Sequence, residues 1–313
     1  MSFNLLIVTI GAFFFMLIHP SSGMARYTVA LVIDEESRSR TASIIEEIEK
    51  IPPFDSLIKS GQIEFKAVGA EASKLGCKQG KVIKRLIECN DDYAVRLAQK
   101  VNADRVVVIS DTATGGAAGS VANIGTAGWG AKLKNWTGID PFSSVVIHEL
   151  LHTWGFTDEY TYPKNDAKIY CDKDGVAGRK SSPNVVVLKD RAPYSSDASA
   201  KSIHGPEIPW FGGIKPSTKI TTGSNLGTPK EGSFFSKEVV VGLFPAGVCD
   251  NSEPPIPTWK PTDQISIMET TVGEIPEAYH AHIYRAVGAT LPQSNSSTVQ
   301  RQGNPTNSTT GPK

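Results

Sequence analysis

Residues 145–160 read VVIHELLHTWGFTDEY and contain the pattern His-Glu-x-x-His. Residues four apart share one face of a helix, so His148 and His152 can direct ring nitrogens at one metal ion. Glu149 lies on the neighbouring face, close enough to hold and deprotonate a water bound to that ion. The stretch therefore predicts a helix that carries a metal site and a general base.

The residues after the second histidine predict how the site is completed. Gly155 permits the left-handed backbone that ends a helix, and the turn could bring Asp158 back to the metal as third ligand. Glu159 and Tyr160 are candidates for orienting the ligands or closing the floor of the site, unless they form an ordinary exposed turn. Other residues that could take the place of Asp158 are Glu159, His204, His280 and His282.

Composition sets limits on partners and size. The 313 residues can form one large domain or two small ones. The 32 lysines and arginines balance the 32 aspartates and glutamates, so the net charge is zero. We therefore expect neither a nucleic acid nor an anionic membrane surface as partner.

The two ends of the chain have the character of processed or unstructured segments. An apolar run at 5–18 precedes small residues at Gly23 and Ala25, which is typical of a signal peptide (1–25) cleaved after Ala25. The run is shorter than a membrane anchor, so we expect a secreted protein, periplasmic if bacterial, with no stable membrane insertion. Residues 291–313 are polar and predict a disordered tail.

Four cysteines remain after that cleavage, and an even number in an exported chain favours two disulfides. The simplest of the three possible pairings joins Cys77 to Cys89 and Cys171 to Cys249. Zinc binding by these cysteines is less expected, because no Cys-x-x-Cys spacing occurs.

The segments before the metal helix alternate between strand and helix patterns. This alternation predicts an α/β fold with a sheet-and-helix layer leading to the metal helix. We expect strands at 27–33, 62–68 and 105–110, and helices at 37–51, 81–86 and 91–101.

A glycine-rich stretch at 112–130 separates this layer from the metal helix. It can let a backbone approach closely, such as a substrate peptide along a sheet edge, or it can be a flexible surface loop. Asp140 and Pro141 provide an N-cap and a first-position proline for the metal helix.

The second half of the chain has few periodic runs. We expect a loop-rich region at 162–238 held by Cys171–Cys249, a short strand at 239–244 and a helix at 275–287. Before that helix stands Ser266-Ile267-Met268. A methionine in a tight turn beneath a metal site, followed by a C-terminal helix, accompanies the long zinc motif in one clan of zinc peptidases.

His148, Glu149, His152, Gly155 and Asp158, with Met268 downstream, resemble the pattern of the metzincin zinc peptidases in which aspartate is the third ligand. HELLHTWG…DEY, the strand VVVIS before the glycine-rich stretch and the segment VGLFPAG at 241–247 are similar to the IgA-peptidase family. The resemblance covers about 27–287. It departs from the family at Pro245 and at 259–261, so immunoglobulin cleavage is not carried over.

The resemblance implies a zincin-like fold: a mixed twisted sheet with the active-site helix, then a loop-rich half that ends in a helix. The catalytic domain would span 26–290, in parts 26–155 and 156–290. One catalytic Zn²⁺ would be held by His148, His152 and Asp158, with Glu149 as general base. We expect a monomeric secreted zinc endopeptidase acting on proteins or peptides. The alternatives are a non-catalytic binding protein on a peptidase fold and a zinc amidohydrolase of non-peptide substrates.

Overall fold

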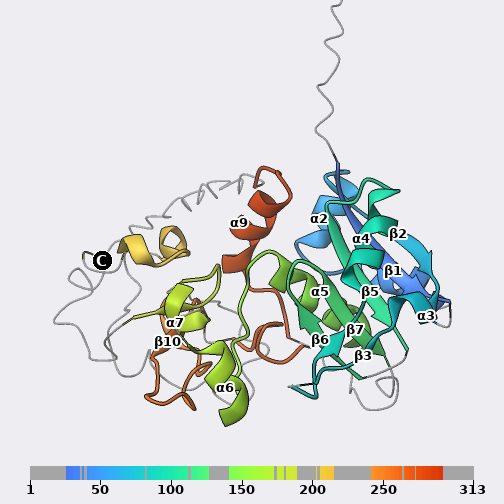
Figure 1. Cartoon of the computed structure of the whole chain (residues 1–313). Coiled ribbons are helices and arrows are strands. Elements are labelled where there is room, and N and C mark those ends of the chain that lie inside the picture. Colours follow the sequence, from blue (N-terminus) through green and yellow to red (C-terminus); the bar gives the residue numbers. More distant parts are fainter. Residues whose placement is uncertain are drawn as a thin grey trace, which may run out of the picture. The chain divides into compact units, whose positions relative to one another are not determined.

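The computed structural model describes most of the chain between residues 26 and 291. The described residues are 26–35, 37–38, 41–81, 83–111, 114–126, 141–172, 175–179, 181–188, 202, 205–214, 241–262, 264–271 and 273–291. The predicted signal peptide, the tail beyond 291, Asp140 and His204 lie outside them. The chain divides into two compact units: Met1–Tyr160 with Ile265–Glu274, and Thr161–Gln264 with Ile275–Lys313 (Figure 1).

The first unit is built on a five-stranded sheet in the order β2-β1-β5-β7-β6. The strands are β1 (Tyr27–Asp34), β2 (Ile63–Ala70), β5 (Arg105–Ser110), β6 (Thr114–Ala118) and β7 (Ala122–Thr126). The first four in spatial order are parallel, and β6 runs antiparallel to β7 at the edge. The predicted α/β class is confirmed, and the mixed sheet is mostly parallel.

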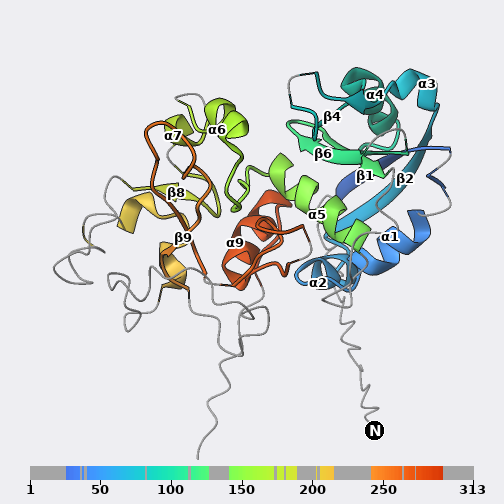
Figure 2. The ribbon, with the colours of Figure 1, turned by 90° about the horizontal axis from the view of Figure 1, so that it is seen from below.

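Helices cover both faces of this sheet (Figure 2). They are α1 (Thr41–Ile48), α2 (Phe54–Lys59), α3 (Ala72–Leu75), α4 (Asp91–Gln99) and α5 (Pro141–Thr153). Alternate residues of the central strands, such as Val32 and Val108, pack against α3 and α4 in one buried cluster. The opposite face carries α5, which packs on β5, β6 and β7. Central strands that are buried on both sides require continuous apolar sequence, and β1 and β5 have it.

Two predicted helices differ in the structure. The helix expected at 37–51 is the shorter α1, because the chain turns at Ser37, whose N–H donates to Asp34. The helix expected at 81–86 is wrong: this segment is the turn of a hairpin between β3 (Lys78–Gln79) and β4 (Ile87–Glu88). Six residues form too short a helix to offset the cost of nucleation, and the flanking strand pairing determines the local structure instead.

The glycine-rich stretch is part of the sheet over its described residues, so the flexible-loop alternative is wrong there. Residues 114–118 and 122–126 form the β6–β7 hairpin, in which Gly115 pairs with Gly125. Gly115 has φ 140°, a conformation that other residues rarely adopt. The glycines thus serve close packing around β6.

The elements described in the second unit are short. Its helices are α6 (Lys164–Tyr170), α7 (Val176–Arg179) and α9 (Glu277–Ala286), with 3₁₀ turns η2 (Gly205–Glu207) and η3 (Phe211–Gly213). A three-stranded antiparallel sheet has the order β8-β10-β9, formed by β8 (Val186–Val187), β10 (Thr258–Lys260) and β9 (Phe244–Pro245). Of the strand expected at 239–244, only Phe244 lies in a strand, at the start of β9. Residues 239–240 lie outside the described residues. Trp210 and Trp259 contribute to the small core around this sheet.

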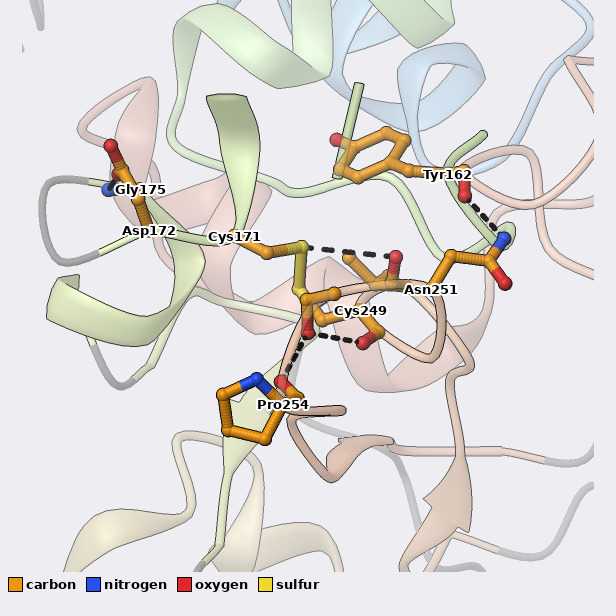
Figure 3. Close-up of a disulfide and its surroundings, with 9 residues drawn as sticks. Tyr162, Cys171, Asp172, Gly175, Cys249, Asn251 and Pro254 are labelled. Atoms are coloured by element: carbon orange, nitrogen blue, oxygen red, sulfur yellow. Dashed lines mark hydrogen bonds between the residues drawn. A yellow bond between two sulfur atoms is a disulfide. The ribbon is translucent and has the colours of Figure 1, made fainter. Parts of the chain in front are cut away.

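Each unit contains one disulfide, with the simplest expected pairing. Cys77–Cys89 closes the β3–β4 hairpin, and Cys171–Cys249 joins residues 78 apart in the second unit (Figure 3). Next to the second disulfide, Asn251 donates to the carbonyl of Tyr162 at 2.7 Å. Across the described residues, no helix has the length and apolar character needed to cross a membrane.

Candidate metal centre

Helix α5 carries His148 and His152, and buried residues at its middle and a hydrogen bond at its end hold it in place. Val145, Val146 and Ile147 are fully buried, so the turn before His148 is part of the core. The helix ends at Thr153, and Gly155 takes φ 90°, as expected for the stop. Between them, Trp154 donates its indole N–H to the Tyr27 hydroxyl at 3.0 Å, which ties the end of α5 to β1.

Three ligand atoms converge beyond this helix. The Nε2 atoms of His148 and His152 are 3.2 Å apart, and each lies 3.2 Å from Oδ1 of Asp158. Tetrahedral zinc has bonds of about 2.0–2.1 Å, which place neighbouring ligand atoms about 3.3 Å apart. The three atoms therefore fit one face of a tetrahedron around a single ion.

The second nitrogen of each ring determines which nitrogen can bind metal. Nδ1 of His148 lies 2.7 Å from the carbonyl oxygen of Ile267, and Nδ1 of His152 lies 2.9 Å from that of Phe156. A carbonyl only accepts, so both Nδ1 atoms carry the proton. In the neutral rings, both Nε2 lone pairs then point into the triangle, which is the tautomer that metal binding needs.

The electrostatics of the triangle favour positive charge. Burial opposes ionisation of Asp158, but the two histidines more than offset it and hold the pKa of Asp158 well below its usual range. Burial likewise lowers the pKa of His152, yet the charge and hydrogen bond of Asp158 raise it to about 9 overall. A group of this kind attracts a cation, and a divalent ion satisfies it better than a proton because it can contact all three ligands.

Glu149 lies beside the triangle and is only 7 % exposed. Its carboxylate occupies the space next to Gly116 of β6, where a Cβ would overlap it. Burial raises the pKa of Glu149, and the histidines and Arg85 oppose that rise. A raised pKa makes a carboxylate a better proton acceptor, which is the property that a general base needs.

The segment Ile265–Glu274 belongs to the same compact unit as the three ligand atoms, and Met268 is fully buried in it. The Met268 carbonyl accepts from the Glu159 N–H at 2.9 Å. The Ser266 hydroxyl donates to the Glu159 carboxylate at 2.7 Å and accepts from the Met268 N–H at 3.1 Å. These bonds join the turn to the chain segment that carries Asp158, while Ile267 orients His148.

The structure distinguishes the residues proposed as third ligand. Among the residues that it describes, the group able to hold a metal consists of His148, His152 and Asp158. Glu159 is 1 % exposed and its carboxylate accepts a hydrogen bond from Ser266, so it ties its own segment to the one that contains Met268. His280 and His282 belong to α9 of the second unit and are not members of the group.

Tyr160 connects the triangle to a residue that the sequence did not single out. Its hydroxyl hydrogen-bonds the Asp158 carboxylate, and burial together with that charge raises the pKa of Tyr160. The guanidinium carbon of Arg85 lies 5.8 Å from the centre of the Tyr160 ring. No local pattern marks Arg85, because it is distant in sequence and comes close only when the β3–β4 hairpin packs in place.

A comparison of the sequence with protein-family models and with curated proteins finds no match. The family resemblance therefore rests on the motif residues alone. A functional proposal for this chain rests on the geometry of the candidate metal centre.

Proposed function

We propose that this chain is a secreted zinc-dependent endopeptidase of the metzincin type, similar to the IgA-peptidase family. The observation that carries the proposal is the triangle of His148, His152 and Asp158, whose three edges of 3.2 Å match a zinc coordination face. Glu149 beside it supports catalysis over a structural role, because a structural metal site needs no general base.

Each of these residues would have a defined task. His148, His152 and Asp158 would hold the ion, which when bound lowers the pKa of a coordinated water and polarises the peptide carbonyl. Glu149 would accept the proton of the attacking water and deliver it to the leaving amine. Glu159 and Ser266 would keep Asp158 and the turn at Met268 in place.

The edge strand β6 supports a peptide as substrate. It is the last strand of the sheet, and its residue Gly116 contacts the Glu149 carboxylate. An extended peptide added to such an edge would run past the general base with its backbone bonded to the strand. Secretion is supported by the signal-like N-terminus and by the two disulfides.

The experiment compares wild-type protein with Glu149→Gln, both loaded with Zn²⁺, on a proteome-derived peptide mixture read by mass spectrometry. We expect Glu149→Gln to keep about one zinc per chain and to lose about 10²–10⁴-fold in cleavage rate, the usual contribution of a general base. Equal cleavage by both proteins would refute the proposed mechanism. A zinc-loaded wild-type protein that cleaves no peptide would favour the non-catalytic or the amidohydrolase alternative, and a screen of non-peptide amides separates these.

A further inference from the structure

The carboxylate of Glu149 lies directly against the backbone of the edge strand β6. A Cβ added at Gly116 would overlap Oε1 of Glu149 and come within 2.7 Å of its Cδ. Glu149 is buried, and within the described part of the chain no hydrogen bond holds its carboxylate. Packing against Gly116 therefore limits where this carboxylate can lie.

Strand β6 is held from two sides. It pairs antiparallel with β7, and β7 pairs in turn with β5. On its other face it contacts the β3–β4 hairpin, since a Cβ at Gly115 would overlap the carbonyl oxygen of Arg85 (Figure 2). Consecutive residues of a strand face opposite sides. Two adjacent glycines thus let β6 contact the hairpin with one residue and the proposed general base with the next.

The hairpin behind β6 is closed at its base. Strands β3 and β4 pair antiparallel, and the Cys77–Cys89 disulfide joins the residues next to that pairing. Inside the hairpin, the Gly80 N–H donates to the Leu86 carbonyl at 2.8 Å. These links leave the hairpin little freedom to move away, so it supports β6 on the face opposite Glu149.

A general base must lie within about 2.6–3.2 Å of the proton that it takes, or reach it through one water. A displacement of about 1 Å can reduce the rate about 100-fold. On the basis of the proposed function, we propose that Gly116 is a positioning residue for Glu149. The missing side chain at 116 leaves room for the carboxylate beside the metal-binding triangle, and the supported backbone of β6 keeps the carboxylate there.

The first test is a double-mutant cycle on stability, which needs no turnover. Gly116→Ala, Gly115→Ala and Gly119→Ala are each made in the wild-type chain and in Glu149→Ala, which lacks the atoms that a Cβ at 116 would meet. The midpoint of urea unfolding is measured at one fixed excess of Zn²⁺. Gly119→Ala is the matched control in the same β6–β7 hairpin, because a Cβ at Gly119 would meet no atom within 4 Å.

We expect Gly116→Ala to lower the midpoint by about 0.3–1 M urea when Glu149 is present, as overpacking of a buried site does. This loss should disappear in the Glu149→Ala background, because two residues in contact are not additive. Gly115→Ala should cost the same in both backgrounds, since it meets the hairpin backbone and has φ 140°. Gly119→Ala should change neither midpoint.

The second test measures peptide cleavage by the zinc-loaded proteins. We expect Gly116→Ala to lower kcat by about tenfold or more and to keep the KM and the zinc content of wild type, because a displaced base impairs proton transfer and not binding. Gly119→Ala should keep the wild-type kcat. A variant that was merely less stable would cleave at the wild-type rate while folded.

Equal losses from Gly116→Ala in both backgrounds would overturn the inference, as would a wild-type kcat or a raised KM in place of a lowered kcat. If Gly116→Ala alone does not fold, its folding in the Glu149→Ala background supports the inference, and its failure there overturns it. Wild-type protein that cleaves no peptide would refute the proposed function, whereas the unfolding midpoints would still show whether β6 positions Glu149.

Discussion

The two compact units of this chain reach a defined structure by different means. The first buries the central strands β1 and β5 between two helical layers, so apolar area removed from water supplies most of its stability. The second has strands of two or three residues, a small core around Trp210 and Trp259, and a disulfide across 78 residues. The link across 78 residues restrains the unfolded chain more than the link across 12 residues in the first unit, because the entropy removed grows with the length of the closed loop.

The candidate metal centre lies in the unit with the larger sheet. All three proposed ligands, Glu149 and the Met268 turn belong to it, although the turn is separated from the rest by the whole second unit in sequence. A rigid scaffold holds ligand atoms to the spacing that an ion requires, and a loop-rich unit does so less well. Four changes test this contrast between a unit built on a five-stranded sheet with the candidate metal centre and a unit closed by a long-range disulfide.

The largest effect is expected from the disulfides. Replacing Cys171 and Cys249 by serine should destabilise the second unit by about 4.5 kcal/mol, since the restraint on an unfolded chain grows with loop length. Replacing Cys77 and Cys89, only 12 residues apart, should cost the first unit about 3 kcal/mol. Hydrogen exchange read peptide by peptide measures the two units separately. A larger loss from the shorter loop would contradict the contrast.

Removing Asp158 should break the metal centre and leave both units folded. Asp158→Ala takes away one corner of the triangle, so zinc affinity should fall by more than about 100-fold, beyond the usual cost of losing a residue that only supports a ligand. Competition with a chromophoric chelator measures it. Asp172→Ala is the control, because its carboxylate bonds Gly175 in the second unit, and it should bind zinc as wild type does.

Acid should weaken the first unit through Asp34 at the end of β1. Burial raises the pKa of Asp34, but hydrogen bonds from Ser37, Ser110 and Asp111 outweigh it and lower the pKa below 3.8. The stability from this depressed pKa is present above about pH 3.8 and is lost as pH falls through the folded value.

Asp34→Asn should therefore cost about 1–3 kcal/mol at pH 7, the effect of disturbing a buried hydrogen-bonded carboxylate, and less at pH 3. Urea unfolding at several pH values measures the difference. The control Asp55→Asn removes a partly exposed carboxylate 3.8 Å from Lys59 and should change stability by less than about 1 kcal/mol at either pH. A pH-independent cost for Asp34→Asn would show that charge is not the cause.

The smallest loss of stability is expected when alanine replaces the glycine that follows a helix, one such glycine in each unit. Gly155 after α5 has φ 90° and Gly288 after α9 has φ 68°, so alanine at either should cost about 1–2 kcal/mol. Only Gly155→Ala should also weaken zinc binding, because it displaces the turn that leads to Asp158. Thermal unfolding and chelator competition on both variants check this. Equal zinc affinity in both would mean that the turn does not position the ligand.

Local sequence determined much of the fold and part of the site. The strand segments at β1, β2 and β5 follow from apolar, β-branched runs, and the His148–His152 face from helical spacing. The failures have a common origin. The local pattern of residues 81–86 predicts a helix, but the pairing of β3 with β4 makes this segment a turn. The glycines near 115 are compatible with a loop, but pairing with β7 makes them part of a strand.

The sequence by itself thus identified two histidines, a glutamate, a helix stop, a downstream aspartate and the two cysteine pairs, because each depends on spacing within a segment or on a small number of pairings. Tertiary structure alone decided that Asp158 completes the triangle, that Ile267 fixes the tautomer of His148 and that Ser266 bonds Glu159. It also brought Arg85 to Tyr160. Such contacts join residues separated by up to 119 positions, and only the packing of a core makes them specific.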